Sequence, residues 1–65
     1  MLKDGMKVVI RSAFGGIFDG KTGIVKKSKF LNDFVLVELD EPTLFSGRKI
    51  NDQLFYPSEI FVLAQ

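Results

Sequence analysis

The chain has 65 residues, and its nine Lys and Arg against eight Asp and Glu give a formal net charge of only +1. It contains no cysteine and no histidine, which excludes a disulfide framework, the usual structural zinc sites and catalysis that depends on Cys or His. The length predicts a single domain over residues 1–65, near the lower limit for a chain that folds without cross-links.

The compartment is inferred from the apolar stretches of the sequence. The first residues contain no apolar run of the kind found in signal peptides. The longest strongly apolar stretch, residues 34–37, is far too short to cross a bilayer. We therefore expect a soluble, cytoplasmic protein that has no membrane insertion, no cofactor and no metal ion.

The first predicted element is a strand over residues 6–11, in which Met6, Val8 and Ile10 share one face. The alternation of apolar and polar side chains predicts that this face lies in the core. A long loop that contains glycine and phenylalanine follows over residues 12–21.

A second strand is expected over residues 22–27, and a polar turn over residues 28–33. Residues 34–39 form the clearest strand, which we expect to end at residues 40–42, because proline cannot donate a ladder hydrogen bond and aspartate favours turns. Its alternate residues should face the core: Val35, Val37 and Leu39.

The last third of the chain is expected to hold a loop over residues 43–52, a short strand over 53–56, a 3₁₀ turn over 57–60 and a final strand over 61–63. No segment shows a helical period over ten or more residues. The pattern predicts an all-β fold, a small barrel of five strands with a 3₁₀ turn before the last strand.

The most informative motif is the run from residue 16 to residue 25, with the spacing G-x-F-x-G-x-x-G-x-V. It resembles the KOW motif of small SH3-like barrels found in transcription elongation factors and ribosomal proteins. The resemblance extends over residues 5–63 and implies a five-stranded SH3-like barrel. Phe18 is expected to plug the core beneath the loop.

A weaker resemblance links the chain to the PsaE family of photosystem I proteins, whose SH3-like barrels help dock ferredoxin on a membrane complex. It is carried by four segments: residues 5–10, 23–25, 35–40 and 46–47. The Tyr56-Pro57-x-x-Ile60 segment also looks like that of plasmid-type dihydrofolate reductases. Residues 52–56 depart from the segment on which that tetrameric activity depends, so the activity is not carried over.

The glycines of the motif could also be interpreted as a phosphate-binding loop. Such a loop needs G-x-x-x-x-G-K-[ST] leading into a helix, whereas these glycines lead into a strand. Structural turns are therefore the favoured interpretation of Gly16, Gly20 and Gly23.

Basic residues gather around the second predicted strand, with Phe30 beside them, and a smaller pair follows Gly47. They are Lys21, Lys26, Lys27 and Lys29, and then Arg48 and Lys49. They could follow a nucleic-acid backbone while a ring stacks on a base. The alternative is a solvated strand edge, where lysine prevents edge-to-edge pairing and nearby acids offset the charge.

Glu38, Asp40 and Glu41 could suggest paired acid–base chemistry, but acids are common and solvated beside a turn. No third group is placed to tune a pKa, and no motif indicates a pocket. We therefore predict that the protein is not an enzyme.

The aromatic residues carry the leading functional hypothesis, because so small an interior cannot bury all seven Phe side chains. Phe14, Phe30 and Tyr56, with Pro57, are expected to converge on one side of the barrel, although loop rings could instead plug its ends. The predicted protein-binding residues are Phe14, Phe30, Phe45, Phe55, Tyr56 and Pro57. The chain is thus expected to be a non-catalytic adaptor that docks on a larger protein or nucleoprotein assembly. An RNA- or DNA-contacting module is the alternative, and a homo-oligomer remains open.

Overall fold

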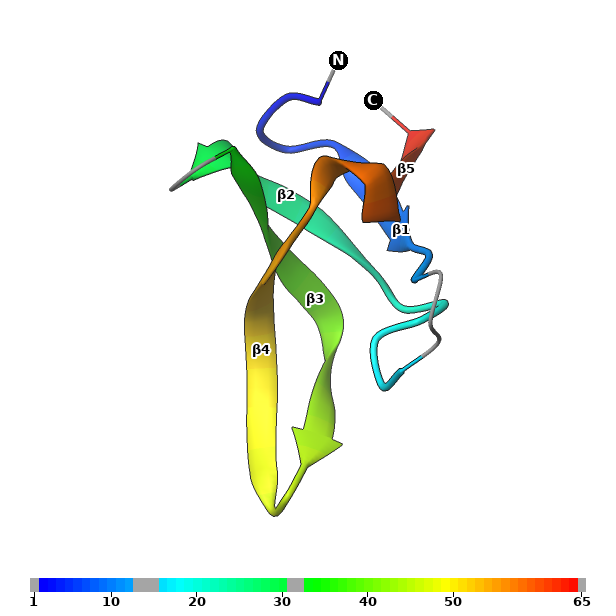
Figure 1. Cartoon of the computed structure of the whole chain (residues 1–65), viewed down its shortest axis with the longest axis vertical. Coiled ribbons are helices and arrows are strands. Elements are labelled where there is room, and N and C mark those ends of the chain that lie inside the picture. Colours follow the sequence, from blue (N-terminus) through cyan, green and yellow to red (C-terminus); the bar gives the residue numbers. More distant parts are fainter. Residues whose placement is uncertain (1, 13–15, 31–32, 65) are drawn as a thin grey trace.

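The computed structural model describes residues 2–12, 16–30 and 33–64 of the chain. Figure 1 shows an all-β fold with one short 3₁₀ helix, η1, before the last strand. The elements are β1 (Lys7–Ile10), β2 (Thr22–Phe30), β3 (Phe34–Phe45), β4 (Arg48–Phe55), η1 (Pro57–Glu59) and β5 (Ile60–Ala64). The predicted class, the five strands and the position of the 3₁₀ turn are confirmed.

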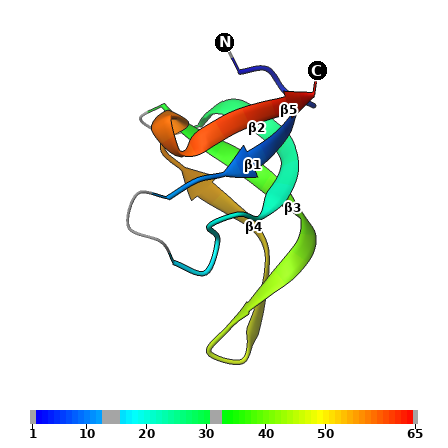
Figure 2. The same cartoon turned by 90° about the vertical axis from the view of Figure 1, so that its right-hand side faces the viewer.

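The five strands form one sheet in the order β4-β3-β2-β1-β5, and each neighbouring pair is antiparallel. Phe55 on edge strand β4 and Ile60 on edge strand β5 nevertheless belong to the same core cluster. The sheet is therefore curled so that its two ends enclose one interior, and β1 and β5 cross over β2 and β3 in Figure 2. The core consists of Met6, Val8, Ile10, Val25, Val35, Val37, Leu39, Phe55 and Ile60.

Alternation along the strands places these side chains, since successive residues of a strand point to opposite faces. Val8 and Ile10 of β1 are fully buried, as are Val35 and Val37 of β3. Phe18, from the loop before β2, packs against this core, and its ring meets the Phe55 ring edge-on at a centroid distance of 5.4 Å. The loop thus closes the interior, as expected from its sequence.

The three motif glycines have two different roles. Gly16 and Gly20 adopt φ of +106° and +83°, in the region that favours glycine. Gly23 instead lies inside β2, buried and opposite Leu39 of β3. Its role is close approach between two strands, so the turn interpretation does not apply to it.

The third and fourth strands are longer than the sequence suggested. β3 does not end at residues 40–42 but runs to Phe45, and β4 begins at Arg48, so the predicted loop over residues 43–52 is wrong. Ser46 and Gly47 join the strands with φ of +51° and +76°, the left-handed values that a two-residue type I′ hairpin turn requires. The hairpin projects from the body of the molecule (Figures 1 and 2).

Proline is accommodated in β3 because the pairing is irregular at that point. Glu38 pairs with Asp52 and Thr43 with Ile50, so residues 39–42 lie opposite Asn51 alone. A proline in such a bulge removes no regular ladder hydrogen bond. The bulge separates the part of the hairpin that covers the core from the part that projects.

Candidate binding surfaces

The predicted aromatic residues are distributed over several surfaces. Phe45 lies at the end of the projecting hairpin and Tyr56 just before η1, and both are exposed. Phe55 is only 5% exposed, so its assignment to a binding surface is wrong, because its place opposite Val35 turns its ring into the core. Phe14 and the side chain of Phe30 lie outside what the structure describes, and their role stays a prediction.

The end of the hairpin carries two large apolar and two basic side chains, which we call the hairpin tip: Leu44, Phe45, Arg48 and Lys49. Leu44 is 68% exposed, and Phe45 is 54% exposed. Leu44 pairs with Lys49 across the hairpin, and Phe45 with Arg48. Each face of the tip therefore presents one apolar and one cationic side chain, since directly opposed residues point the same way.

A second exposed ring lies at the corner between β4 and η1. Tyr56 is 61% exposed and its ring lies 4.9 Å from that of Phe34, centroid to centroid, at a tilt of 42°. Its backbone N–H donates to Glu59 Oε1 at 3.0 Å, and its carbonyl accepts from the Glu59 N–H at 2.9 Å. The Glu59 carbonyl in turn accepts from the Arg11 N–H at 2.8 Å. These bonds hold the corner against β1.

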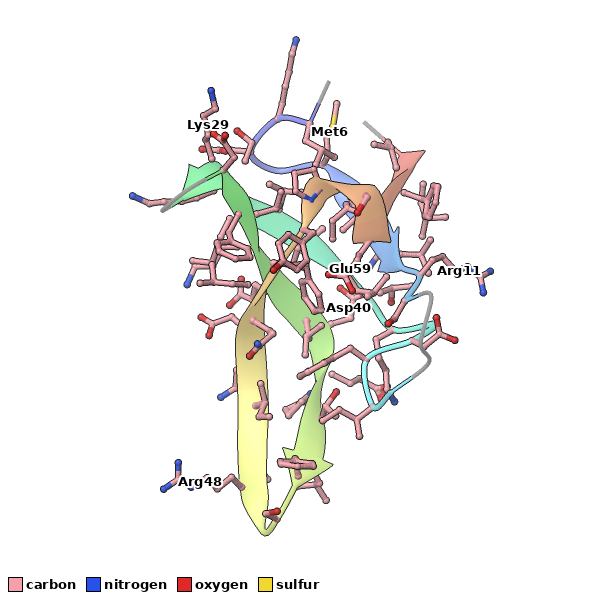
Figure 3. The ribbon with its side chains drawn as sticks, in the orientation of Figure 1. Met6, Arg11, Lys29, Asp40, Arg48 and Glu59 are labelled. Atoms are coloured by element: carbon pink, nitrogen blue, oxygen red, sulfur yellow. The ribbon has the colours of Figure 1, made fainter. Side chains whose placement is uncertain are left out.

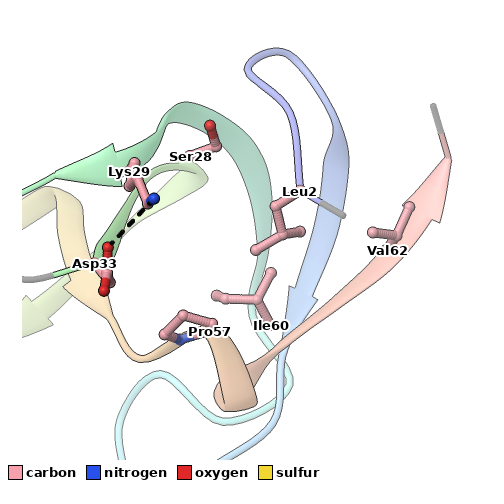
Figure 4. A pocket seen from close by; sticks show the side chains of 7 residues that line it. All are labelled: Leu2, Ser28, Lys29, Asp33, Pro57, Ile60 and Val62. Carbon is pink, nitrogen blue, oxygen red and sulfur yellow. Dashed lines mark ion pairs between the residues drawn. The ribbon is translucent and has the colours of Figure 1, made fainter.

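Beyond this corner lies an open groove of about 550 Å³. The Lys29–Asp33 ion pair, at 3.7 Å, borders one side of it (Figure 4). Its lining residues are Leu2, Ser28, Lys29, Asp33, Pro57, Ile60 and Val62.

Of these lining residues, Pro57 alone belongs to the predicted binding set. Leu2 reaches the groove because the N-terminal segment is held beside β2: the Ser28 N–H donates to Asp4 Oδ1 at 2.8 Å. Such a long-range contact leaves no local signal in the sequence.

The predicted basic residues do not form one continuous patch. Lys29 and Arg48 lie at opposite ends of the molecule (Figure 3). Lys26 forms an ion pair with Asp52 at 3.6 Å, and Lys29 forms one with Asp33. Each of these ammonium groups is therefore offset by a carboxylate. Within the described ranges, Arg48 and Lys49 form no ion pair.

Asp40, one of the three carboxylates considered for chemistry, has a structural role. Its Oδ2 accepts a hydrogen bond from Lys7 Nζ and another, of 2.6 Å, from Thr22 Oγ1. The Lys7 ammonium, and then the Thr22 hydroxyl, lower the pKa of Asp40 below its usual value of 3.8. Among the described residues no group of three or more acidic side chains gathers as metal ligands would.

Comparison of the chain with protein-family models, curated proteins and solved structures finds no match. In the described part of the chain, no helix has the length and apolar character needed to cross a lipid bilayer. The functional argument therefore depends on the surfaces described above.

Proposed function

We propose that this chain is a non-catalytic binding module, an SH3-like barrel of KOW type, which docks on a larger protein through its hairpin tip. The glycine motif, the strand order β4-β3-β2-β1-β5 and η1 before the last strand support this assignment. The docking role depends on the hairpin.

One observation carries the proposal: two large apolar side chains, Leu44 and Phe45, are exposed at the end of an extension that lies outside the core. Their hydrophobicity contributes little to folding, because they lose little contact with water when the chain folds. A projecting apolar tip is suited to a concave site on a partner, where burial of Leu44 and Phe45 supplies affinity. Arg48 and Lys49 beside them set orientation through charge.

The test compares two phenylalanines of similar exposure, Phe45 (54%) and Phe61 on β5 (52%). Capture from a host lysate, with nuclease added, should lose its protein partner with Leu44→Ser/Phe45→Ser and keep it with Phe61→Ser. The thermal unfolding of the double variant should stay close to that of the parent chain. Equal loss of capture with both variants, or retention by the double variant, contradicts the proposal.

A nucleic-acid role is a second candidate, favoured by the hairpin pairs that set Arg48 opposite Phe45 and Lys49 opposite Leu44. A cation beside a ring is a combination that single-strand binders use for phosphate and base. The ion pairs of Lys26 and Lys29 weigh against a wider basic surface.

The salt dependence of oligonucleotide affinity tests this candidate. Each phosphate contact contributes a slope of about −0.7 in log K against log salt for a single strand. Arg48→Gln/Lys49→Gln should therefore reduce the slope by about 1.4. Affinity that does not change with salt, or no binding at low salt, would reject the candidate.

A further inference from the structure

Strand β5 forms one edge of the sheet. It pairs with β1 on one side, and none of the described strands pairs with it on the other. An edge strand presents unpaired N–H and C=O groups that can pair with another extended chain. The shape of any occupant is therefore that of a β-strand.

The register identifies which backbone groups face that open edge. The Arg11 N–H donates to the Glu59 carbonyl at 2.8 Å, and Val9 lies opposite Phe61 two residues further along. Hydrogen-bonded and non-bonded pairs alternate in an antiparallel ladder. The backbone groups of Phe61 thus point toward β1, and those of Ile60 and Val62 point outward.

The side chains of β5 lack the charge that usually protects such an edge. Its sequence is Ile-Phe-Val-Leu-Ala, and Phe61, Val62 and Leu63 are all exposed. The opposite edge strand, β4, carries Arg48, Lys49 and Asp52. Charged side chains are a common means of preventing edge-to-edge pairing, so one edge of this sheet is protected and the other is open.

We propose that the open edge of β5 pairs with β5 of a second copy of this chain, antiparallel and about a two-fold axis at Val62. In that register Phe61 lies opposite Leu63 of the second copy, and Ile60 opposite its Ala64. The strand is complementary to itself, because no charge on it opposes its own image. The net charge of +1 adds little repulsion between copies.

The pairing closes as a dimer. A symmetric contact uses the same edge of both copies, which leaves the charged β4 edges outermost and stops further growth. The groove-lining side chains Ile60 and Val62 of both copies then fall on one face of the joined sheet. The inference is independent of the docking role of the hairpin tip.

Sedimentation equilibrium of the 65-residue chain tests the proposal, at concentrations up to about 1 mM. The parent chain should show a monomer–dimer equilibrium. Val62→Pro removes an outward N–H but no bond to β1, so it should remain monomeric with an unchanged circular dichroism spectrum. Val62→Lys, which sets two cations opposite each other at the axis, should be monomeric too.

Asn51→Lys on β4 is the control, since it adds the same charge at the other edge; it should dimerise as the parent does. Amide exchange at Val62 should also slow as the parent chain is concentrated. A parent chain that stays monomeric throughout overturns the proposal. A dimer that Val62→Lys leaves intact, or growth beyond two copies, overturns it as well.

Discussion

Gly23 of β2 lies so close to Glu38 of β3 that a Cβ at position 23 would be 2.4 Å from the Glu38 carbonyl oxygen. The same Cβ would be 2.8 Å from Val37 Cγ1. Neither neighbour can move freely, since one is backbone and the other lies in the core. The last glycine of the KOW-type motif is therefore a packing requirement of the sheet.

Gly23→Ala should consequently destabilise the domain by about 1–3 kcal/mol, the usual cost of overpacking a core. Chemical denaturation gives the free energy of unfolding. Gly20→Ala is a useful comparison: nothing lies within 4 Å of its Cβ, and only its φ of +83° opposes the change. A Gly23→Ala variant as stable as the parent would contradict the close approach.

Phe55 and Phe45 should respond in opposite ways to truncation. Phe55→Ala removes a buried ring that contacts Phe18, and should cost about 3–5 kcal/mol. Phe45→Ala, on the hairpin tip, should leave the free energy of unfolding nearly unchanged. Thermal unfolding of the two variants side by side measures the difference, and similar losses would show that the tip is part of the core.

The pH dependence of stability should report on Asp40. Its pKa is lowered in the folded state, so its bonds to Lys7 and Thr22 stabilise the fold above the ordinary pKa and are lost as the pH falls through the folded pKa. Asp40→Asn should therefore melt at a lower temperature than the parent at pH 7.

That difference should shrink in acid. Melting curves at about pH 7 and about pH 2 bracket the ordinary carboxyl pKa, and the two proteins should converge at the lower value. Glu41→Gln, at the adjacent and exposed position, should melt close to the parent at both. A constant offset for Asp40→Asn would show that its ionisation is not involved.

The hairpin turn offers a stabilising substitution. Ser46 adopts φ of +51° and precedes Gly47, and Asn-Gly is the pair that type I′ turns favour. Ser46→Asn should raise the free energy of unfolding by up to about 1 kcal/mol. Ser46→Val, which opposes a positive φ, should lower it. Chemical denaturation that ranks the two variants in the reverse order would refute this turn geometry.

Several features of the fold can be predicted from local patterns. Alternation in β1 and β3 identifies their buried faces, and Pro57 marks the 3₁₀ turn. The projecting hairpin is not predicted, because Pro42 indicates the end of a strand. The bulge that tolerates this proline depends on the pairing of Glu38 with Asp52, which local sequence does not specify.

The candidate surfaces are harder to predict for the same reason. Whether a ring is buried depends on its register with another strand, and Phe55 lies opposite Val35. The ion pair of Lys26 with Asp52 joins β2 to β4 across β3. The sequence pattern around β2 therefore includes a charge that the fold offsets.

The most direct test of the docking role is site-specific photo-crosslinking. A benzophenone amino acid at position 45 should crosslink to a protein other than this chain, and the product should survive nuclease treatment. The same probe at position 61, of similar exposure in the parent, should give no such product. Equal crosslinking from both positions, or none from position 45, would contradict docking through the hairpin tip.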